Sequence, residues 1–87
     1  MRTLLFFHAS WCPPCRFYQK QFIEPLQKLV GKDRITAIDA QKDPFTADKY
    51  MVARLPSVVL LENDTVVNRI TGAIDIEKTA KYLEECD

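Results

Sequence analysis

The residues best suited to chemistry in this 87-residue chain are Cys12 and Cys15, which are separated by two prolines. They come where an apolar run, residues 4–7, gives way to a long helical pattern. A helix that begins near Cys12 places both sulfur atoms in its first turn, close enough to form a disulfide. The unpaired N–H groups and the positive dipole end of such a turn favour a thiolate. Because the thiolate is the form that attacks disulfides, the motif predicts a dithiol–disulfide exchange site.

The elements that must position this motif alternate between strands and helices. The pattern predicts strands at 2–9, 34–40, 57–61 and 66–70, with a turn at 62–65 and a bend or bulge at Gly72. It predicts helices from about Cys12 to Leu29, over 45–52 after Asp43-Pro44, and after a cap at Asp75. The first helix has a predicted apolar stripe and a kink at Pro25. That stripe consists of Tyr18, Phe22, Leu26 and Leu29.

This order, βαβ-α-ββα, favours one α/β domain over residues 1–87. A right-handed crossover makes the first two strands parallel, and the hairpin adds an antiparallel pair. We therefore expect a four-stranded mixed sheet with helices on both faces.

Charge and apolar patterning exclude several classes of function. Twelve basic and twelve acidic residues cancel without forming a run, so we expect no binding to nucleic acid or to an anionic membrane. The apolar stretch at residues 4–7 is shorter than the roughly 7–15 residues of a signal peptide or the about 20 of a membrane span. An odd number of cysteines, three, argues against a disulfide scaffold. We expect a cytoplasmic monomer, unless a leader precedes the sequence.

The motif and its surroundings together resemble the thioredoxin family. Trp11 through Cys15 follows the first strand, Pro56 opens the third, and the resemblance covers nearly the whole chain. Its other segments are Phe7 and Ala9, 43–50, Leu55-Pro56-Ser57 and Gly72-Ala73. It implies a thioredoxin-like fold and an enzyme, a thiol–disulfide oxidoreductase that reduces protein disulfides. The length is closer to that of glutaredoxins.

The resemblance also implies a role for each site residue. Cys12 would be the exposed nucleophile, and Cys15 the partly buried thiol that resolves the mixed disulfide. A cis bond before Pro56 would turn the backbone of Leu55 toward the sulfurs, where it could pair with an extended substrate segment. The expected substrate groove consists of Trp11, Pro13, Pro14, Leu55, Pro56, Gly72 and Ala73.

Two departures from the family pattern concern proton transfer. Many thioredoxins carry a buried acid six residues before the first cysteine, with a lysine partner on the next strand; here these positions are Phe6 and Ala37. Replacing both members of a buried ion pair can be neutral for stability, but it leaves Cys15 without the usual proton acceptor. His8 lies on the same strand face as Phe6 and is the nearest candidate acceptor. The other reading, which we favour, is that His8 is a half-buried aromatic substitute.

The Pro13-Pro14 dipeptide and the absence of a cation between the cysteines favour the disulfide form. We therefore expect a reductant, with a potential nearer the approximately −270 mV of thioredoxin than the roughly −120 mV of a strong oxidant. Electrons would come from a separate reductase of the thioredoxin-reductase type or from glutathione, and no cofactor or metal is expected in this chain.

Three alternative functions stay open: a glutaredoxin-like, glutathione-dependent reductase, a secreted oxidase or isomerase, and a thioredoxin-fold binding subunit. Cys86 is expected to be a functionless thiol, with glutathionylation or intermolecular pairing as the alternative.

Overall fold

The computed structural model describes residues 1–85 as a single sheet covered by helices on both faces. Its strands are β1 (Arg2–His8), β2 (Ile35–Asp39), β3 (Ser57–Glu62) and β4 (Thr65–Thr71). Its α-helices are α1 (Pro13–Tyr18), α2 (Glu24–Val30), α3 (Pro44–Lys49) and α4 (Ile76–Glu84). A π-helical turn, Gln19–Ile23, joins α1 to α2, and a short 3₁₀ turn, Lys32–Arg34, precedes β2. None of the helices in this part of the chain is long and apolar enough to cross a membrane.

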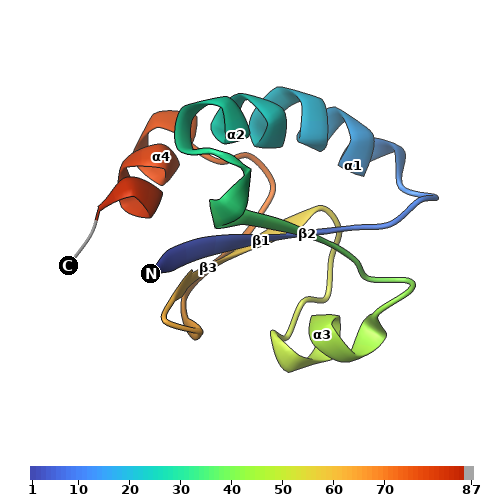
Figure 1. The fold of residues 1–87 in the computed structure, drawn as a ribbon. Helices are drawn as coiled ribbons and strands as arrows, with labels where there is room; N and C mark the ends of the chain where they lie inside the picture. Colours follow the sequence, from blue (N-terminus) through green and yellow to red (C-terminus); the bar gives the residue numbers. More distant parts are fainter. Residues whose placement is uncertain (86–87) are drawn as a thin grey trace.

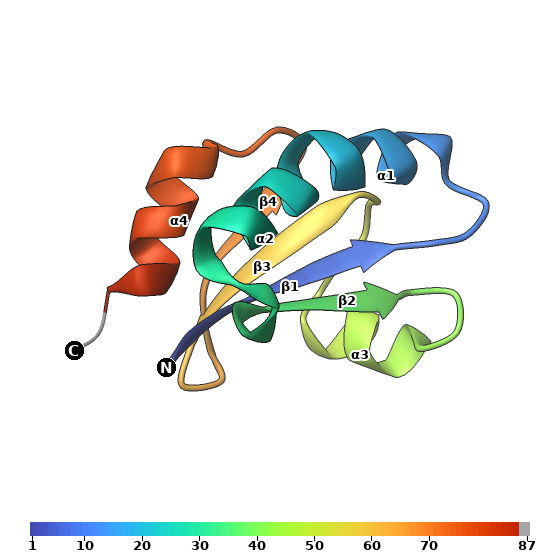
Figure 2. The same ribbon diagram turned by 45° about the horizontal axis from the view of Figure 1, so that its top comes forward.

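The sheet has the strand order β2-β1-β3-β4. β1 runs parallel to β2 and antiparallel to β3, and β4 returns antiparallel to β3. Helices α1, α2 and α4 cover one face and α3 covers the other (Figures 1 and 2). The predicted four-stranded mixed sheet with helices on both faces is therefore confirmed.

The central strand β1 divides the core into two clusters. Successive side chains of a strand point to opposite faces, so Leu4 and Phe6 join Leu26 and Leu83 beneath α2 and α4. Leu5 and Phe7 face the other way; they pack with residues of β3 and α3, namely Ala47, Val59 and Leu61. Since both of its faces are buried, β1 fixes the position of the segment that follows it, which carries the cysteines.

The first long helix departs from the predicted stripe. Leu29 is 55% exposed, whereas Ile23 is buried and takes a place in the core. Pro25 has no N–H to donate, and its ring would clash with the carbonyl of Gln21 in a regular helix. The π-helical turn lies just before this proline, and its wider turn shifts the buried side by about one residue. The structure thus has a π-helical turn in front of Pro25, where the sequence predicts a kink, and the predicted burial of Leu29 was wrong.

Local signals fixed the ends of several other elements. Asp43 and Asp75 cap α3 and α4 as predicted, each by accepting a backbone hydrogen bond. Asn63 and Asp64 adopt positive φ values of 49° and 70°, as a tight hairpin turn requires. α3 ends at Lys49, three residues earlier than predicted, because Met51 turns into the left-handed region at φ 58°.

Candidate redox site

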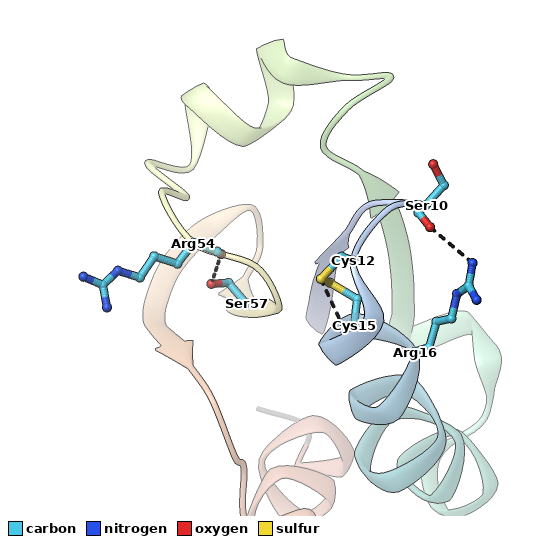
Figure 3. The surroundings of a disulfide bond; sticks show 6 residues. All are labelled: Ser10, Cys12, Cys15, Arg16, Arg54 and Ser57. Atoms are coloured by element: carbon cyan, nitrogen blue, oxygen red, sulfur yellow. Dashed lines mark hydrogen bonds between the residues drawn. A yellow bond between two sulfur atoms is a disulfide. The ribbon is translucent and has the colours of Figure 1, made fainter.

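The two cysteines form a disulfide at the start of α1 (Figure 3). Cys12 is the N-cap of the helix, with extended backbone, and its Sγ accepts a hydrogen bond of 3.3 Å from the N–H of Cys15. Pro13 and Pro14 occupy the first helical positions, where an N–H would have no partner within the helix. The backbone of Cys12 is held in turn by its N–H, which donates to the carbonyl of Ala9 over 3.2 Å. The predicted placement of both sulfurs in the first turn is confirmed.

The burial of the cysteines corrects one expectation. Cys12 was predicted to be exposed, but its exposed fraction is only 4%, against 2% for Cys15. The cap places the Cys12 side chain against the turn, where it packs with Ala9 and the half-buried Leu55. The two sulfurs differ in their surroundings instead, because Cys12 lines an open cleft and Cys15 is not among its lining residues.

A cis peptide bond between Leu55 and Pro56 lies beside the disulfide. Figure 3 shows the loop from Arg54 to Ser57 facing the cysteines. The hydroxyl of Ser57 donates to the carbonyl of Arg54 and lies 3.1 Å from the hydroxyl of Thr71, so the loop is tied at its base to β4. The predicted cis bond is thus present.

Two clefts flank this arrangement, and they differ in character. The first, which we call the α3-side cleft, has a volume of about 420 Å³ and includes two polar side chains. Its lining residues are Trp11, Cys12, Ala40, Gln41, Pro44, Ala47, Asp48, Val52, Ala53 and Leu55. The second, the helix-side pocket, has a volume of about 380 Å³ and has no charged side chain in its lining. Pro13, Pro14, Phe17, Phe22 and Pro56 contribute most of its wall.

The predicted groove residues are therefore distributed over two surfaces. Trp11 and Leu55 belong to the α3-side cleft, and the three prolines belong to the helix-side pocket. Gly72 and Ala73 line neither. Gly72, with φ 99°, follows Thr71, which pairs with Ser57 at the end of the β3–β4 register.

The positions of the family's buried ion pair carry apolar groups here. Phe6 and Ala37 are partners in the parallel register of β1 and β2, as the sequence pattern requires. Phe6 is buried, but Ala37 is exposed because β2 is an edge strand, so the pair is apolar without being enclosed on both sides.

Phe6 instead belongs to a stack of rings between β1 and α1. The ring of His8 lies 5.3 Å from that of Phe6, and Phe6 lies 5.7 Å from Tyr18, which follows Cys15 by one helical turn. His8 is half-buried and on the same face as Phe6, as expected. Its role as a proton acceptor stays a prediction.

No sequence pattern indicates that the Tyr18 hydroxyl is buried without a hydrogen-bond partner in the described part of the chain. This hydroxyl is buried and has no hydrogen-bond partner among residues 1–85. Burial raises the pKa of Tyr18 to about 12, since the charged phenolate is poorly solvated there.

Phe17, the residue before Tyr18, was also missed by the sequence analysis: it points outward and is 74% exposed. The sequence signal for the exposure of Phe17 is that this residue lies outside the predicted apolar stripe of the helix.

Charged groups around the site are solvent-facing. Arg16 reaches back from α1 and donates to the carbonyl of Ser10 over 3.3 Å, as drawn in Figure 3. Hydrogen bonds from the Thr46 hydroxyl and backbone hold the pKa of Asp43 below its usual value, beside the α3-side cleft. Among the described residues, no three His, Cys, Asp or Glu side chains gather as a metal site.

Fold and site together define a class of protein: an α/β domain in which a Cys-x-x-Cys disulfide caps the first helix and faces a cis-proline. The family model described as Thioredoxin matches residues 1–85, and the chain belongs to the thioredoxin family.

Individual relatives agree with this assignment. The chain is 29% identical to chloroplastic thioredoxin Y1 of Arabidopsis thaliana, over 95% of this chain and 48% of that protein. It is 28% identical to a thioredoxin of Synechocystis sp., over 95% of this chain and 78% of the relative. The X-ray structure of Fasciola hepatica thioredoxin superposes with a TM-score of 0.77 at 27% identity, over 94% of this chain and 77% of the other. The chain spans about half the length of the plant relatives that it matches.

Proposed function

We propose that this protein is a thiol–disulfide oxidoreductase that reduces disulfides in other proteins. The observation that carries the proposal is the Cys12–Cys15 disulfide at the start of α1, beside the cis bond at Pro56, in a chain of the thioredoxin family. A helix N-terminus supports the thiolate form that exchange requires. The cleft next to Cys12 supplies a route by which a substrate sulfur can approach.

Cys12 is the attacking residue in this proposal. It lines the cleft and accepts the Cys15 N–H, and that hydrogen bond favours its charged form. Its thiolate attacks one sulfur of the substrate disulfide. A Cys12–substrate disulfide forms, the substrate's own S–S bond breaks, and the released sulfur takes up a proton.

Cys15 completes the reaction. Its thiolate attacks Cys12 Sγ, which forms the Cys12–Cys15 bond and releases the second substrate sulfur, again with uptake of a proton. Two electrons and two protons pass from the protein to the substrate. Since the two thiols carry both electrons, the cycle needs no cofactor within this chain.

The oxidised protein must then be reduced by a partner. We propose a separate reductase of the thioredoxin-reductase type, which holds flavin and NADPH itself, with glutathione as the alternative donor. A reducing compartment such as the cytoplasm suits this cycle, because the dithiol has to be kept reduced. One chain supplies both thiols, so a monomer is sufficient.

Reduction of insulin tests the proposal directly. With dithiothreitol as electron source, the protein should accelerate the precipitation of insulin chains, and Cys12→Ser should abolish the effect. Cys15→Ser should accumulate a mixed disulfide between Cys12 and insulin, visible by mass spectrometry. Cys86→Ser is the matched control and should leave the rate unchanged.

Two other outcomes would replace the proposal. If Cys15→Ser retained most of the activity toward a protein–glutathione mixed disulfide, the glutathione-dependent alternative would be favoured. If the reduced protein left insulin and small disulfides untouched, the alternative of a thioredoxin-fold binding subunit would stand.

A further inference from the structure

The helix-side pocket lies next to the redox disulfide, and the three prolines of its wall are also residues of the expected substrate groove. Its other residues come from the first long helix and were not part of that expectation. Its exposed rim is formed by Pro13, Pro14 and Phe17, and the half-buried Phe22 and Pro56 lie deeper. Pro13 and Pro14 connect the two cysteines, and Pro56 follows the cis bond beside them. A polypeptide that is covalently joined to Cys12 must therefore lie close to this pocket.

The lining favours one kind of occupant. Gln21 and the buried Tyr18 complete the wall, and no charged side chain contributes to it. A charged group placed there would lose water without gaining an ionic partner, whereas an apolar group would gain from the transfer. The volume of about 380 Å³ falls in the range of roughly 300–1,000 Å³ that is usual for ligand sites.

Phe17 is the residue that points to binding. It is a large apolar side chain, 74% exposed, two positions after Cys15. At that exposure it contributes little to the core, since the adjacent Tyr18 takes the buried position on the helix. Aromatic residues exposed at the rim of an apolar pocket are typical of surfaces that bind other proteins.

We propose that the helix-side pocket binds a large apolar or aromatic side chain of the substrate protein, close in sequence to the cysteine that Cys12 attacks. Phe17 is then a specificity-determining residue for the reaction. The side chains of an extended segment alternate in direction, so the helix-side pocket and the α3-side cleft receive different substrate residues. The more polar α3-side cleft, which includes Asp48 and Gln41, tolerates hydrophilic ones. This inference rests on the proposed function.

Single-turnover reduction of designed peptides tests it. The probes are short peptides joined as symmetrical disulfides through one cysteine, with either Phe or Ser at each of the two positions on both sides of it. The pre-reduced protein should reduce the Phe peptide about tenfold faster than the Ser peptide at one or more of these positions. All rates are expressed relative to that for the disulfide of 2-mercaptoethanol, which is too small to span the pocket.

Variants assign the preference to the pocket. Phe17→Ser should bring the ratio of Phe to Ser peptide rates close to one, and Phe17→Leu should preserve most of the preference. Phe45→Ser is the matched control, because Phe45 is 84% exposed on α3 and lines neither cleft. Both phenylalanines are exposed, so neither change removes a core side chain.

Several results would overturn the inference. Equal rates for Phe and Ser peptides with the unmodified protein, a preference that survives Phe17→Ser, or an equal loss in Phe45→Ser would each do so. So would sedimentation showing a dimer that Phe17→Ser dissociates, because a second copy would then occupy the pocket. Failure to reduce the peptides and the small disulfide alike would instead overturn the proposed function, and this inference with it.

Discussion

The N–H of Cys15 donates a hydrogen bond to Cys12 Sγ over 3.3 Å, within the turn that begins α1. The bond is directional: the donor belongs to the inner cysteine and the acceptor to the cysteine that lines the α3-side cleft. After reduction, the same donor would stabilise negative charge on Cys12. The first turn therefore makes the two thiols unequal, although both are buried.

Selective alkylation should reveal this inequality. In the reduced protein at neutral pH, iodoacetamide should modify Cys12 at least about tenfold faster than Cys15, because hydrogen bonding and the cleft both favour Cys12. Peptide mapping by mass spectrometry measures both rates in one sample. Equal rates would mean that the hydrogen bond and the cleft do not distinguish the sulfurs.

The ring stack of His8, Phe6 and Tyr18 gives a second prediction. His8→Gln should flatten the pH–rate profile for disulfide exchange near neutrality, because His8 is the nearest candidate acceptor for the Cys15 proton. Single-turnover rates of peptide disulfide reduction from pH 5 to 9 provide the measurement. A profile that keeps its shape would leave His8 as a packing partner of Phe6.

Tyr18→Phe should stabilise the protein by about 1 kcal/mol, because the hydroxyl it removes is buried without a partner. The effect should grow in alkaline solution. Burial raises the pKa of Tyr18 from an ordinary value of 10 to about 12. The part of the stability that depends on a neutral Tyr18 is therefore fully present below pH 10 and is lost as the pH rises toward 12. Urea unfolding at pH 7 and pH 11 tests both statements. A loss of stability at pH 7 would show that the hydroxyl has a favourable interaction.

The cap of α3 should respond to acid. The folded-state pKa of Asp43 is lowered by the Thr46 hydrogen bonds, so its contribution is present above the ordinary value of 3.8 and is lost as the pH falls through the lower folded value. Asp43→Asn keeps a good N-cap but cannot titrate, so it should reduce the acid sensitivity of the melting temperature. Thermal melts from pH 6 down to pH 2 compare the two proteins. Asp75→Asn, at the cap of α4, is a matched control that should leave the Asp43 contribution in place.

The shifted stripe on the first long helix can be tested by truncation. Leu26→Ala should lower the free energy of unfolding by about 2–5 kcal/mol, because Leu26 is fully buried. Leu29→Ala, at the 55% exposed position one turn away, should change it by less than about 0.5 kcal/mol. Denaturant unfolding compares them, and similar losses would contradict the register that the π-helical turn imposes.

Much of the fold was predictable because its signals are local. Asp43 and Asp75 mark helix starts by their ability to accept N–H bonds, and Asn63-Asp64 suits a turn that needs positive φ. The cysteine pair was equally visible, since its spacing on a helix depends on three residues only. Cys86, which is expected to be a functionless thiol, lies outside the described residues.

The features that were not predicted depend on contacts distant in sequence. Cys12 is covered by Leu55, which approaches from the loop before β3, and no pattern near residue 12 indicates this. Leu29 fits a regular helical period, but the π-helical turn alters that period. Ala37 is exposed because β2 has a neighbour on one side only within residues 1–85. Phe17 lines the same pocket as Pro56, which is distant in the sequence, so no pattern near residue 17 indicates the pocket.

The burial of β1 on both faces has a consequence for the redox cycle. The cysteines follow directly from this strand, and its side chains belong to both core clusters. The disulfide closes a loop of a few residues, so it restricts the unfolded chain much less than the core does. The amides of β1 pair with strands on both sides, so we expect them to be well protected from hydrogen exchange in both redox states. The disulfide could then open and close a few residues from β1 without loosening the strand.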